Sequence, residues 1–266
     1  MTEELAAGKD AVLNLYKRKS ETPLQTIERY VKAHPEYKGA KMTYAGRLDP
    51  MAEGVLVVLS GEKNKEREAY TGLDKDYEFE FVLGMETDTF DVLGKITAVK
   101  GAQAGQATGA GNEKIVKSAL EKYVGTFEQK YPPYSSKVLN GTPLFELARR
   151  GALAEKDIPT HEVTASKIEL VSARTVSKDE FIESAFAAIS AVTGDFRQKD
   201  ILKIWNAYFA TSPAEFAIYK ARVSCGSGFY VRQLVSDLGK DLGTGAVTVS
   251  ILRTRVGTFK IEDSIR

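Results

Sequence analysis

The stretch Tyr44-Ala-Gly-Arg-Leu-Asp-Pro-Met-Ala-Glu-Gly54 constrains the fold most, because the apolar run at residues 55–59 follows it at once. A short apolar run introduced by a glycine is typical of a buried strand. The stretch therefore places one carboxylate, Asp49, at the entrance to the core. Taken alone, Asp49 followed by Pro50 favours a helix N-cap that opens one short helical turn. A catalytic carboxylate is the alternative interpretation.

The length of 266 residues suits one large domain or two small ones, and 43% apolar with 27% charged residues is a globular balance. No apolar run is long enough to cross a bilayer. Residues 1–5 lack the basic start and apolar stretch of a signal peptide. We therefore predict no membrane association and a cytoplasmic location, which a single cysteine, Cys225, suits.

Cys225 and two distant histidines, His34 and His161, form no zinc-ligand cluster, so we predict no metal. The formal net charge of +1 gives no bulk attraction to nucleic acid. Charge is nevertheless segregated. Residues 71–100 hold seven acids against three lysines, and residues 220–266 hold eight bases against four acids. The basic segment suits contact with phosphates, and an ordinary solvated surface explains it equally well.

Apolar periodicity predicts the elements. We expect strands at residues 12–16, 55–59, 77–83, 95–99, 163–171, 215–225, 247–255 and 258–261. We expect helices at residues 22–34, 62–72, 113–123, 144–150, 179–193, 198–210 and 229–242. Residues 101–111 are rich in Gly, Ala and Gln and predict a mobile loop. The count predicts an α+β fold with a large, mainly antiparallel mixed sheet flanked by helices.

Three local patterns are more detailed. Thr22 with Pro23 and Gln25 predicts a capped helix start. Alternation at residues 77–83 puts the aromatic side chains on one strand face and the glutamates on the other. The paired prolines at residues 129–137 exclude helix and central strand, so this segment should be extended and expose Tyr131, Tyr134 and Ser135.

Seven segments, in order, resemble the TruB family of tRNA pseudouridine synthases and cover most of residues 12–262. They are Gly46-Arg-Leu-Asp-Pro-Met-Ala-Glu-Gly54, Asp76-Tyr77, Thr87-Asp-Thr-Phe-Asp-Val-Leu-Gly94, Gln129-Lys-Tyr-Pro-Pro-Tyr-Ser-Ser-Lys137, Leu144-Phe-Glu-Leu-Ala-Arg-Arg-Gly151, Cys225-Gly-Ser-Gly-Phe-Tyr-Val-Arg232 and Leu252-Arg253. The resemblance implies the pseudouridine synthase catalytic fold, as a single domain over residues 1–266.

The resemblance also implies roles. Asp49 falls on the catalytic aspartate, and Tyr77 on the tyrosine that stacks on the target base and takes part in proton transfer. Tyr230 and Arg232 match a Tyr-x-Arg motif, in which the arginine pairs with the catalytic carboxylate and the tyrosine lines the pocket. Leu252 matches an apolar pocket residue. Candidate substrate contacts are Tyr44, Arg47, Leu252 and Tyr134.

The implied chemistry suits these residue types. Converting uridine to pseudouridine breaks an N-glycosidic bond, turns the base and rejoins it through carbon, so neither a cofactor nor a metal is required. A carboxylate supplies a nucleophile or charge stabiliser, and a tyrosine is able to accept the carbon-bound proton. An arginine beside the aspartate keeps it ionised. An aromatic pocket suits a uridine that has left its stack.

The sequence departs from the family pattern in three places. Tyr44 stands where the family usually has a histidine, and Arg47 where it commonly has a small residue. Gly-Arg-Leu-Asp also resembles the ribosomal-RNA synthase families RsuA and RluA, so the RNA target stays open. The motif Lys-Pro-x-Gly is replaced by Lys17-Arg18-Lys19-Ser20, and we expect Lys17-Arg18-Lys19 to be a solvated turn rather than a dedicated RNA contact.

Residues 174–213 resemble an insertion, for which we predict a helical pair on the domain edge that covers a sheet edge rather than extending an RNA surface. Asp88 and Asp91 resemble metal ligands, but we favour turn caps. The chain stops at Arg266, just after the last expected strand. We therefore expect no C-terminal PUA domain, and weaker or differently placed tRNA contacts.

Three functions follow as hypotheses. The first is a pseudouridine synthase acting on the T loop of tRNA (tRNA position 55), with the T arm as partner and a monomeric enzyme. The second is the same isomerisation on another uridine, of the ribosomal-RNA type. The third is an RNA-binding or tRNA-folding protein without catalysis, against which the joint presence of Asp49, Tyr77, Tyr230 and Arg232 argues.

Overall fold

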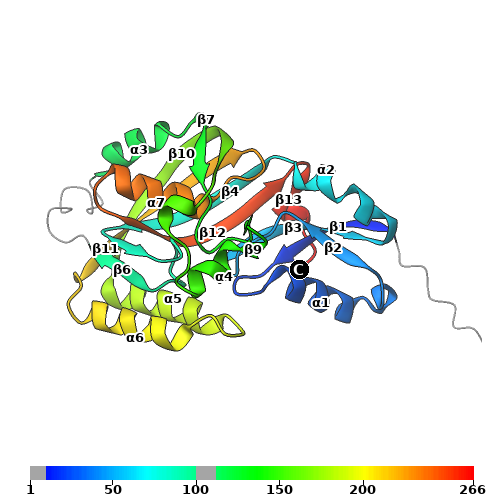
Figure 1. Cartoon of the computed structure of the whole chain (residues 1–266), viewed down its shortest axis with the longest axis horizontal. Helices are drawn as coiled ribbons and strands as arrows, with labels where there is room; N and C mark the ends of the chain where they lie inside the picture. The colour runs from blue at the N-terminus through cyan, green and yellow to red at the C-terminus, as the bar shows by residue number, and fades with distance from the viewer. Residues whose placement is uncertain (1–9, 100–111) are drawn as a thin grey trace, which may run out of the picture. The chain divides into compact units, whose positions relative to one another are not determined.

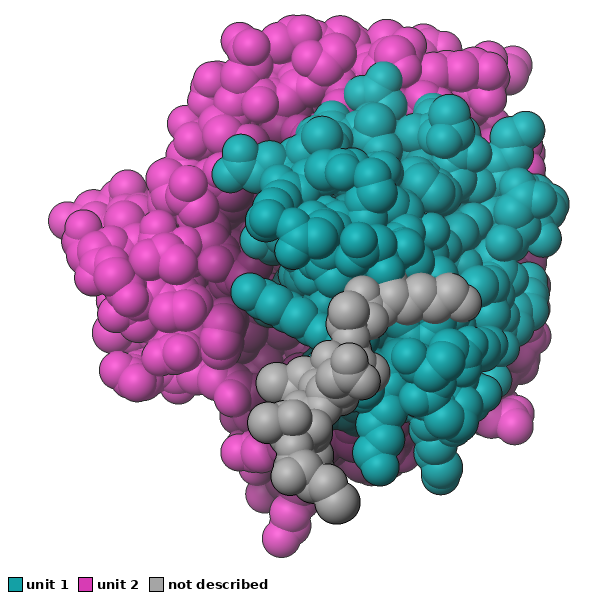
Figure 2. Space-filling view, turned by 90° about the vertical axis from the view of Figure 1, so that its right-hand side faces the viewer, with its two compact units in different colours: residues 1–77, 252–266 teal, residues 78–251 magenta. Residues whose placement is uncertain are grey.

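The computed structural model describes residues 10–99 and 112–266, so the loop expected at residues 101–111 lies outside the described part of the chain. The chain divides into two compact units, residues 1–77 with 252–266 (unit 1) and residues 78–251 (unit 2), coloured separately in Figure 2. The expectation of a single catalytic domain remains a prediction.

The main sheet has nine strands. Seven follow the order β1-β3-β12-β4-β11-β10-β7, while β2 pairs with β3 and β13 with β12. Pairs such as β1 with β3 and β10 with β11 are antiparallel. The expected α+β class with a mainly antiparallel sheet is confirmed. The strands are β1 (Ala11–Lys17), β2 (Met42–Ala45), β3 (Ala52–Ser60), β4 (Lys75–Leu83), β7 (Gly125–Lys130), β10 (Thr160–Ser177), β11 (Glu215–Cys225), β12 (Ala246–Val256) and β13 (Phe259–Lys260).

Unit 1 is built on β3, whose register with β1 runs from Ala11 opposite Ser60 to Lys17 opposite Gly54. Helix α1 (Pro23–Ala33) begins as predicted. The Thr22 side chain accepts from the Gln25 backbone, and the Gln25 side chain accepts from the Thr22 backbone. This helix packs Ile27 and Tyr30 onto apolar residues of β1 and β3.

The helical turn expected after Asp49 is wrong. Residues 49–52 instead form a single tight turn, in which the Ala52 N–H donates to the Asp49 carbonyl at 3.0 Å. Strand β3 already begins at Ala52, before the purely apolar run, which leaves no room for a helix. The charged stretch after β3 is helical as predicted. It consists of a 3₁₀ segment at Gly61–Glu66 followed by α2 (Arg67–Thr71).

In unit 2, β10 pairs with β11 from Ala165 opposite Cys225 to Ser177 opposite Glu215. It is much longer than predicted, and its first residues pair with β7, which the sequence did not predict. Strand β4 alternates buried and partly exposed residues as expected, with Phe79 and Phe81 on its buried face. Shorter strands are β5 (Met85–Thr87), β6 (Ile96–Val99), β8 (Val138–Leu139) and β9 (Thr142–Pro143).

The helices of unit 2 confirm the predicted ones. They are α3 (Glu113–Glu121), α4 (Leu144–Arg149), α5 (Lys178–Ala191), α6 (Gln198–Phe209) and α7 (Val231–Asp241). Helices α5 and α6 lie side by side, as Figure 1 shows. Within the described ranges, no helix is long and apolar enough to cross a membrane.

We expected the α5–α6 pair to cover a sheet edge, and this expectation is wrong. Its side chains Phe181 and Trp205 belong to one buried cluster with Phe216 of β11 and Val247 and Val249 of β12. Strands β11 and β12 lie inside the strand order rather than at its ends. The pair therefore covers a face of inner strands, whose alternating apolar side chains require such a cover.

Candidate active site

Asp49 lies half-buried on a turn of unit 1 that buried cations hold in place. Lys17 and Arg253 are 0% and 1% exposed. Lys17 Nζ donates to the carbonyl oxygens of Ala52 at 2.6 Å and Arg18 at 3.2 Å. Arg253 donates from Nε to the Val55 carbonyl at 2.7 Å and from Nη2 to the Gly46 carbonyl at 3.1 Å. The carbonyl oxygens on both sides of Asp49 thus receive cationic donors.

Lys17 corrects our expectation of a solvated turn. Its side chain follows the inward parity of Leu13 and Leu15 on β1 and is therefore buried. Burial lowers the pKa of the Lys17 ammonium to about 8, while the Asp49 carboxylate is the leading charge that opposes this shift. Ser20, where the family motif has glycine, adopts a left-handed φ of 71° and donates its N–H to the Pro50 carbonyl at 2.8 Å.

Gly54 is required by the close approach of two backbones. It has φ +108° inside β3, and a Cβ added there would collide with the backbone of Arg253 on β12. Only glycine combines this φ with such an approach at little steric cost. The glycine of the motif thus lets β12 bring Arg253 beneath the Asp49 turn.

The other nominated residues of unit 1 lie on strands around this turn. Tyr77 is buried on β4, and Leu252 is half-buried on the face of β12 opposite Arg253. Tyr44 lies on β2, and its hydroxyl accepts a hydrogen bond from Nη2 of the exposed Arg47 at 3.2 Å. The two departures from the family pattern beside Asp49 are therefore in contact with each other.

Arg232, in unit 2, is held by two loops. It lies in the first turn of α7 and is 3% exposed. Its Nη1 donates to the Thr89 carbonyl at 2.7 Å and its Nη2 to the Tyr134 carbonyl at 3.2 Å. Its Nε lies 3.6 Å from Oδ2 of the buried Asp91. Segments 87–95 and 129–137 together fix the guanidinium plane.

Tyr230 immediately precedes α7 and is anchored through its backbone. Its N–H donates to Gln129 Oε1 at 2.9 Å, and its carbonyl accepts from Gln129 Nε2 at 3.1 Å. Its half-buried ring meets the ring of Tyr131 edge-on at a centroid distance of 5.7 Å. Tyr131 in turn stacks on His161 at 4.0 Å. The tyrosine nominated for the pocket thus belongs to an aromatic cluster.

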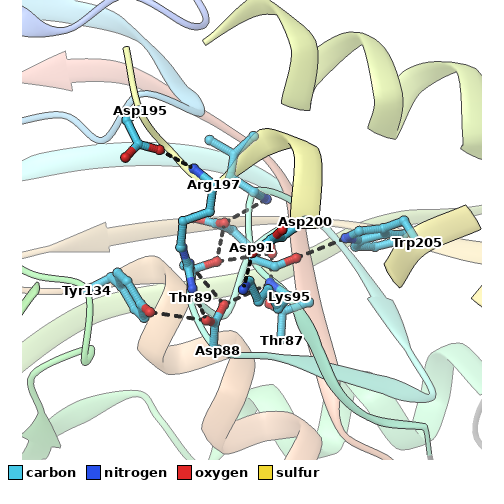
Figure 3. Close-up of polar contacts among 12 residues, drawn as sticks. Thr87, Asp88, Thr89, Asp91, Lys95, Tyr134, Asp195, Arg197, Asp200 and Trp205 are labelled. Carbon is cyan, nitrogen blue, oxygen red and sulfur yellow. Dashed lines mark hydrogen bonds and ion pairs between the residues drawn. The ribbon is translucent and has the colours of Figure 1, made fainter. Parts of the chain in front are cut away.

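Tyr134 is engaged by a polar network, shown in Figure 3. Its hydroxyl donates to Asp88 Oδ2 at 3.1 Å, and the Arg197 guanidinium lies 4.6 Å from its ring centroid. Burial, aided by the Asp88 charge, raises the pKa of Tyr134 to about 12. Its hydroxyl is therefore a neutral donor at physiological pH.

The predicted exposure of segment 129–137 is wrong for Ser135, which is buried, whereas Tyr131 and Tyr134 are half-buried. The prolines keep the segment extended, but two of its carbonyls accept hydrogen bonds from other parts of unit 2. Arg232 donates to Tyr134, and the Phe145 N–H donates to Ser135 at 3.1 Å. These contacts draw the segment inward.

Asp88 and Asp91 are turn caps, as we favoured. Oδ1 of Asp91 accepts from the Leu93 N–H at 2.9 Å, and Oδ1 of Asp88 accepts from the Lys95 N–H at 2.8 Å. Across residues 10–99 and 112–266, no group of three or more His, Cys, Asp or Glu side chains is arranged to hold a metal.

The structure assigns the nominated residues to two groups. Unit 1 carries Asp49, Tyr77, Tyr44, Arg47 and Leu252, and unit 2 carries Tyr230, Arg232 and Tyr134. Our sequence reasoning missed the contributions of Lys17, Arg253, Asp91 and Arg197. Only the inward strand parity of Lys17 was visible in the sequence.

Two solved structures share this fold, each with a TM-score of 0.54. One is described as "Structure of H/ACA RNP bound to a substrate RNA containing 2'-deoxyuridine", with 17% identity over 100% of this chain and 53% of that chain. The other is "Crystal Structure of a Cbf5-Nop10-Gar1 Complex", with 18% identity over 97% of this chain and 51% of that chain. At these identities the likeness concerns the fold alone.

Residues 34–186 match the model "TruB family pseudouridylate synthase (N terminal domain)", so the chain belongs to the TruB family. It is 30% identical to tRNA pseudouridine synthase B of Lactobacillus delbrueckii over 86% of this chain and 63% of the relative. It is 31% identical to the Aromatoleum aromaticum protein of the same name over 96% of this chain and 66% of that relative. It is 30% identical to the Bordetella pertussis protein of that name over 91% of this chain and 78% of that relative. The chain spans just under two thirds of the first two relatives.

Proposed function

We propose that this chain isomerises uridine to pseudouridine in the T loop of tRNA, at tRNA position 55. The observation that carries the proposal is Asp49, in the family motif, on a turn whose carbonyls are held by buried Lys17 and Arg253. Membership of the TruB family and the names of the relatives support it. The proposal includes a monomeric enzyme in the cytoplasm that contacts the T arm.

In this proposal Asp49 acts as nucleophile or charge stabiliser on the target nucleoside. Lys17 supplies positive charge close to Asp49, because the ammonium and the carboxylate interact electrostatically. The hydrogen-bonded turn restricts where the carboxylate points, which lowers the cost of reaching a reactive geometry.

The remaining groups bind and orient. Tyr77 stacks on the extruded base and accepts the proton that leaves carbon. Tyr230 and Leu252 line the pocket, and Tyr44 and Arg47 contact RNA beside Asp49. Arg232 contributes a fixed guanidinium, because Thr89, Tyr134 and Asp91 engage it on several sides. A role of Arg232 toward Asp49 is part of the proposal.

The same isomerisation on a ribosomal-RNA-type uridine is the second candidate. The observation that favours it is the contact between Tyr44 and Arg47, which places a cation where the family commonly has a small side chain. A cation two residues before Asp49 suits an RNA whose phosphates follow a different path past the motif.

The test is release of tritium from RNA labelled at uridine C5, with unmodified tRNA and ribosomal RNA as parallel substrates. Wild type should release tritium from tRNA, and Asp49→Asn should lose at least about a thousandfold in rate. Glu53→Gln is the matched control. Glu53 is a carboxylate in the same motif and accepts a hydrogen bond from the Tyr16 hydroxyl at 2.7 Å. The Glu53→Gln variant should retain activity.

Three other outcomes of this test would each contradict a different part of the proposal. Release from ribosomal RNA alone would move the target, and equal release by Asp49→Asn would remove the role of Asp49. Binding of tRNA by wild type without release from either RNA would identify a non-catalytic tRNA-binding protein.

A further inference from the structure

Helix α6, in the segment 174–213 that we predicted to be an insertion, contacts residues 87–95 at three points (Figure 3). Arg197, just before the helix, forms a two-pronged ion pair with Asp88, at 2.5 Å from Nη1 and 3.3 Å from Nη2. Asp200 accepts from Lys95 Nζ at 2.9 Å. Trp205 Nε1 donates to the Gly94 carbonyl at 2.9 Å. The inserted helix therefore does more than cover an apolar sheet face.

Residues 87–95 are one of the two segments that hold Arg232. Its Thr89 carbonyl accepts from Arg232 Nη1, and Asp91 pairs with Arg232 Nε. The second holder is Tyr134, whose carbonyl accepts from Arg232 Nη2. Arg197 contacts both holders, because it pairs with Asp88 in one segment and lies over the Tyr134 ring in the other.

Arg197 is itself firmly placed. Its side chain is 21% exposed and that of Asp88 22%, so the pair is largely shielded, and two-pronged arginine–carboxylate contacts are strong and directional. Its backbone has a left-handed φ of 63°, which is unfavourable for a non-glycine residue. The Arg197 N–H donates to Asp195 Oδ1 at 3.2 Å, and Arg149 Nη2 donates to the Asp195 carbonyl at 2.7 Å. These contacts support the strained turn.

We propose that Arg197 is a positioning residue for Arg232, and that it makes the inserted helical pair part of the synthase machinery. The inference rests on the proposed function of Arg232. Arg197 joins Asp88 to the Tyr134 ring, so the carbonyls of Thr89 and Tyr134 keep a fixed separation and orient the Arg232 guanidinium. Without Arg197, Asp88 keeps only the Tyr134 hydroxyl and the Lys95 N–H among these partners, and the Tyr134 ring loses its cation.

The first test compares Arg197→Ala with wild type in single-turnover pseudouridine formation and in equilibrium binding of tRNA. We expect the rate to fall about tenfold while the dissociation constant changes less than about twofold, because misplacement of a catalytic group slows chemistry more than binding. Arg197→Lys keeps the charge but not the planar two-pronged contact. It should recover part of the lost rate.

Asp200→Ala is the matched control. It removes a contact between the same helix and the same segment, but Asp200 is 64% exposed, whereas Arg232 is held by Thr89, Tyr134 and Asp91. Its rate should stay within about twofold of wild type. Rates are measured below the melting temperature of every variant. If Arg197→Ala does not fold, Arg197→Lys and Asp88→Asn carry the comparison.

The decisive test is coupling to Arg232. In an Arg232→Lys background that retains residual activity, Arg197→Ala should cause no further loss, because its effect passes through the guanidinium. An equal loss in both backgrounds would overturn the proposal, as would a rate for Arg197→Ala equal to that of wild type. An inactive wild type would instead refute the proposed function itself, so the two failures are distinguishable.

Discussion

Buried cations that serve backbone carbonyls define this protein at the residue scale. Lys17, Lys75 and Arg253 are each at most 5% exposed. Lys75 Nζ donates to the Thr71 carbonyl at 2.8 Å and to that of Leu73, as Lys17 and Arg253 do around the Asp49 turn. A buried charge is tolerated only where such partners replace water. These buried cations therefore stabilise the backbone inside the protein and are not available to contact RNA.

Lys17 makes folding stability depend on pH in a way that a variant can expose. The folded pKa of about 8 lies below the ordinary value of 10.5, so between these values the unfolded chain binds more protons than the folded one. The free energy of unfolding should therefore rise with pH in this window. Relative to Lys17→Met, the wild-type value should rise by about 1 kcal/mol per pH unit between pH 8 and pH 10.

The measurement is urea unfolding at several pH values, followed by circular dichroism. Above pH 10 the comparison ends, because burial raises the pKa of Tyr16 and Tyr30 to about 12 and their ionisation then favours the unfolded chain. A difference between the two proteins that stays flat from pH 8 to pH 10 would contradict the assignment of this titration to Lys17.

At the element scale, α6 makes two kinds of contact, one through its apolar side chains and one through its polar side chains. Its apolar stripe, with Ile201, Trp205 and Phe209, packs into the buried cluster of unit 2. Its polar contacts reach residues 87–95. Trp205 belongs to both sets, because its ring is fully buried while its indole N–H donates to the Gly94 carbonyl.

Truncation of Trp205 should separate these two contributions. We expect Trp205→Ala to lower the free energy of unfolding by about 3–5 kcal/mol, through lost packing and a cavity. Trp205→Phe should cost about 1–3 kcal/mol, because the Gly94 carbonyl loses its donor. Urea unfolding measures both. The exposed Lys203→Ala should stay within about 0.5 kcal/mol of wild type, and a similar loss there would show that the helix, not the indole, decides the effect.

At the scale of the whole molecule, the acidic and basic segments of the chain neutralise each other. Glu78 pairs with Lys220 and with Arg222, each at 2.6 Å. The Lys220 ammonium, as leading partner, holds the pKa of Glu78 below its usual range. Asp76 pairs with Arg255, and Asp91 with Arg232. The basic segment that we expected either to face phosphates or to be freely solvated is thus largely committed to internal pairs.

This pairing predicts which arginines matter for RNA. Arg222→Gln should leave the dissociation constant for tRNA within about twofold, because its guanidinium already pairs with Glu78. Arg47→Gln should weaken binding several-fold and lower the salt-dependence slope by about one, since Arg47 is exposed beside the proposed target. Binding titrations at several salt concentrations measure both. A larger loss for Arg222→Gln than for Arg47→Gln would contradict this interpretation of the charges.

Patterns within a few residues of each other were predictable. The cap formed by Thr22 and Gln25, the alternation of β4 and the full extent of β11 follow from local periodicity and capping. Strand β7 was missed because Gly125–Lys130 carries little apolar signal and is defined by its pairing with β10. The Asp49 turn was misjudged because the start of β3 depends on its partner strands.

By itself, the sequence determined the motifs of the TruB family and most helices and strands, because these depend on neighbours along the chain. Only the tertiary structure decided what each charge does. The buried Lys17 ammonium donates to the Ala52 carbonyl, 35 residues along the chain, and Arg197 pairs with Asp88 although 109 residues separate them. Apart from strand parity, as at Lys17, a charged side chain carries no local mark of its burial, and its partner is set by whichever distant segment packs against it.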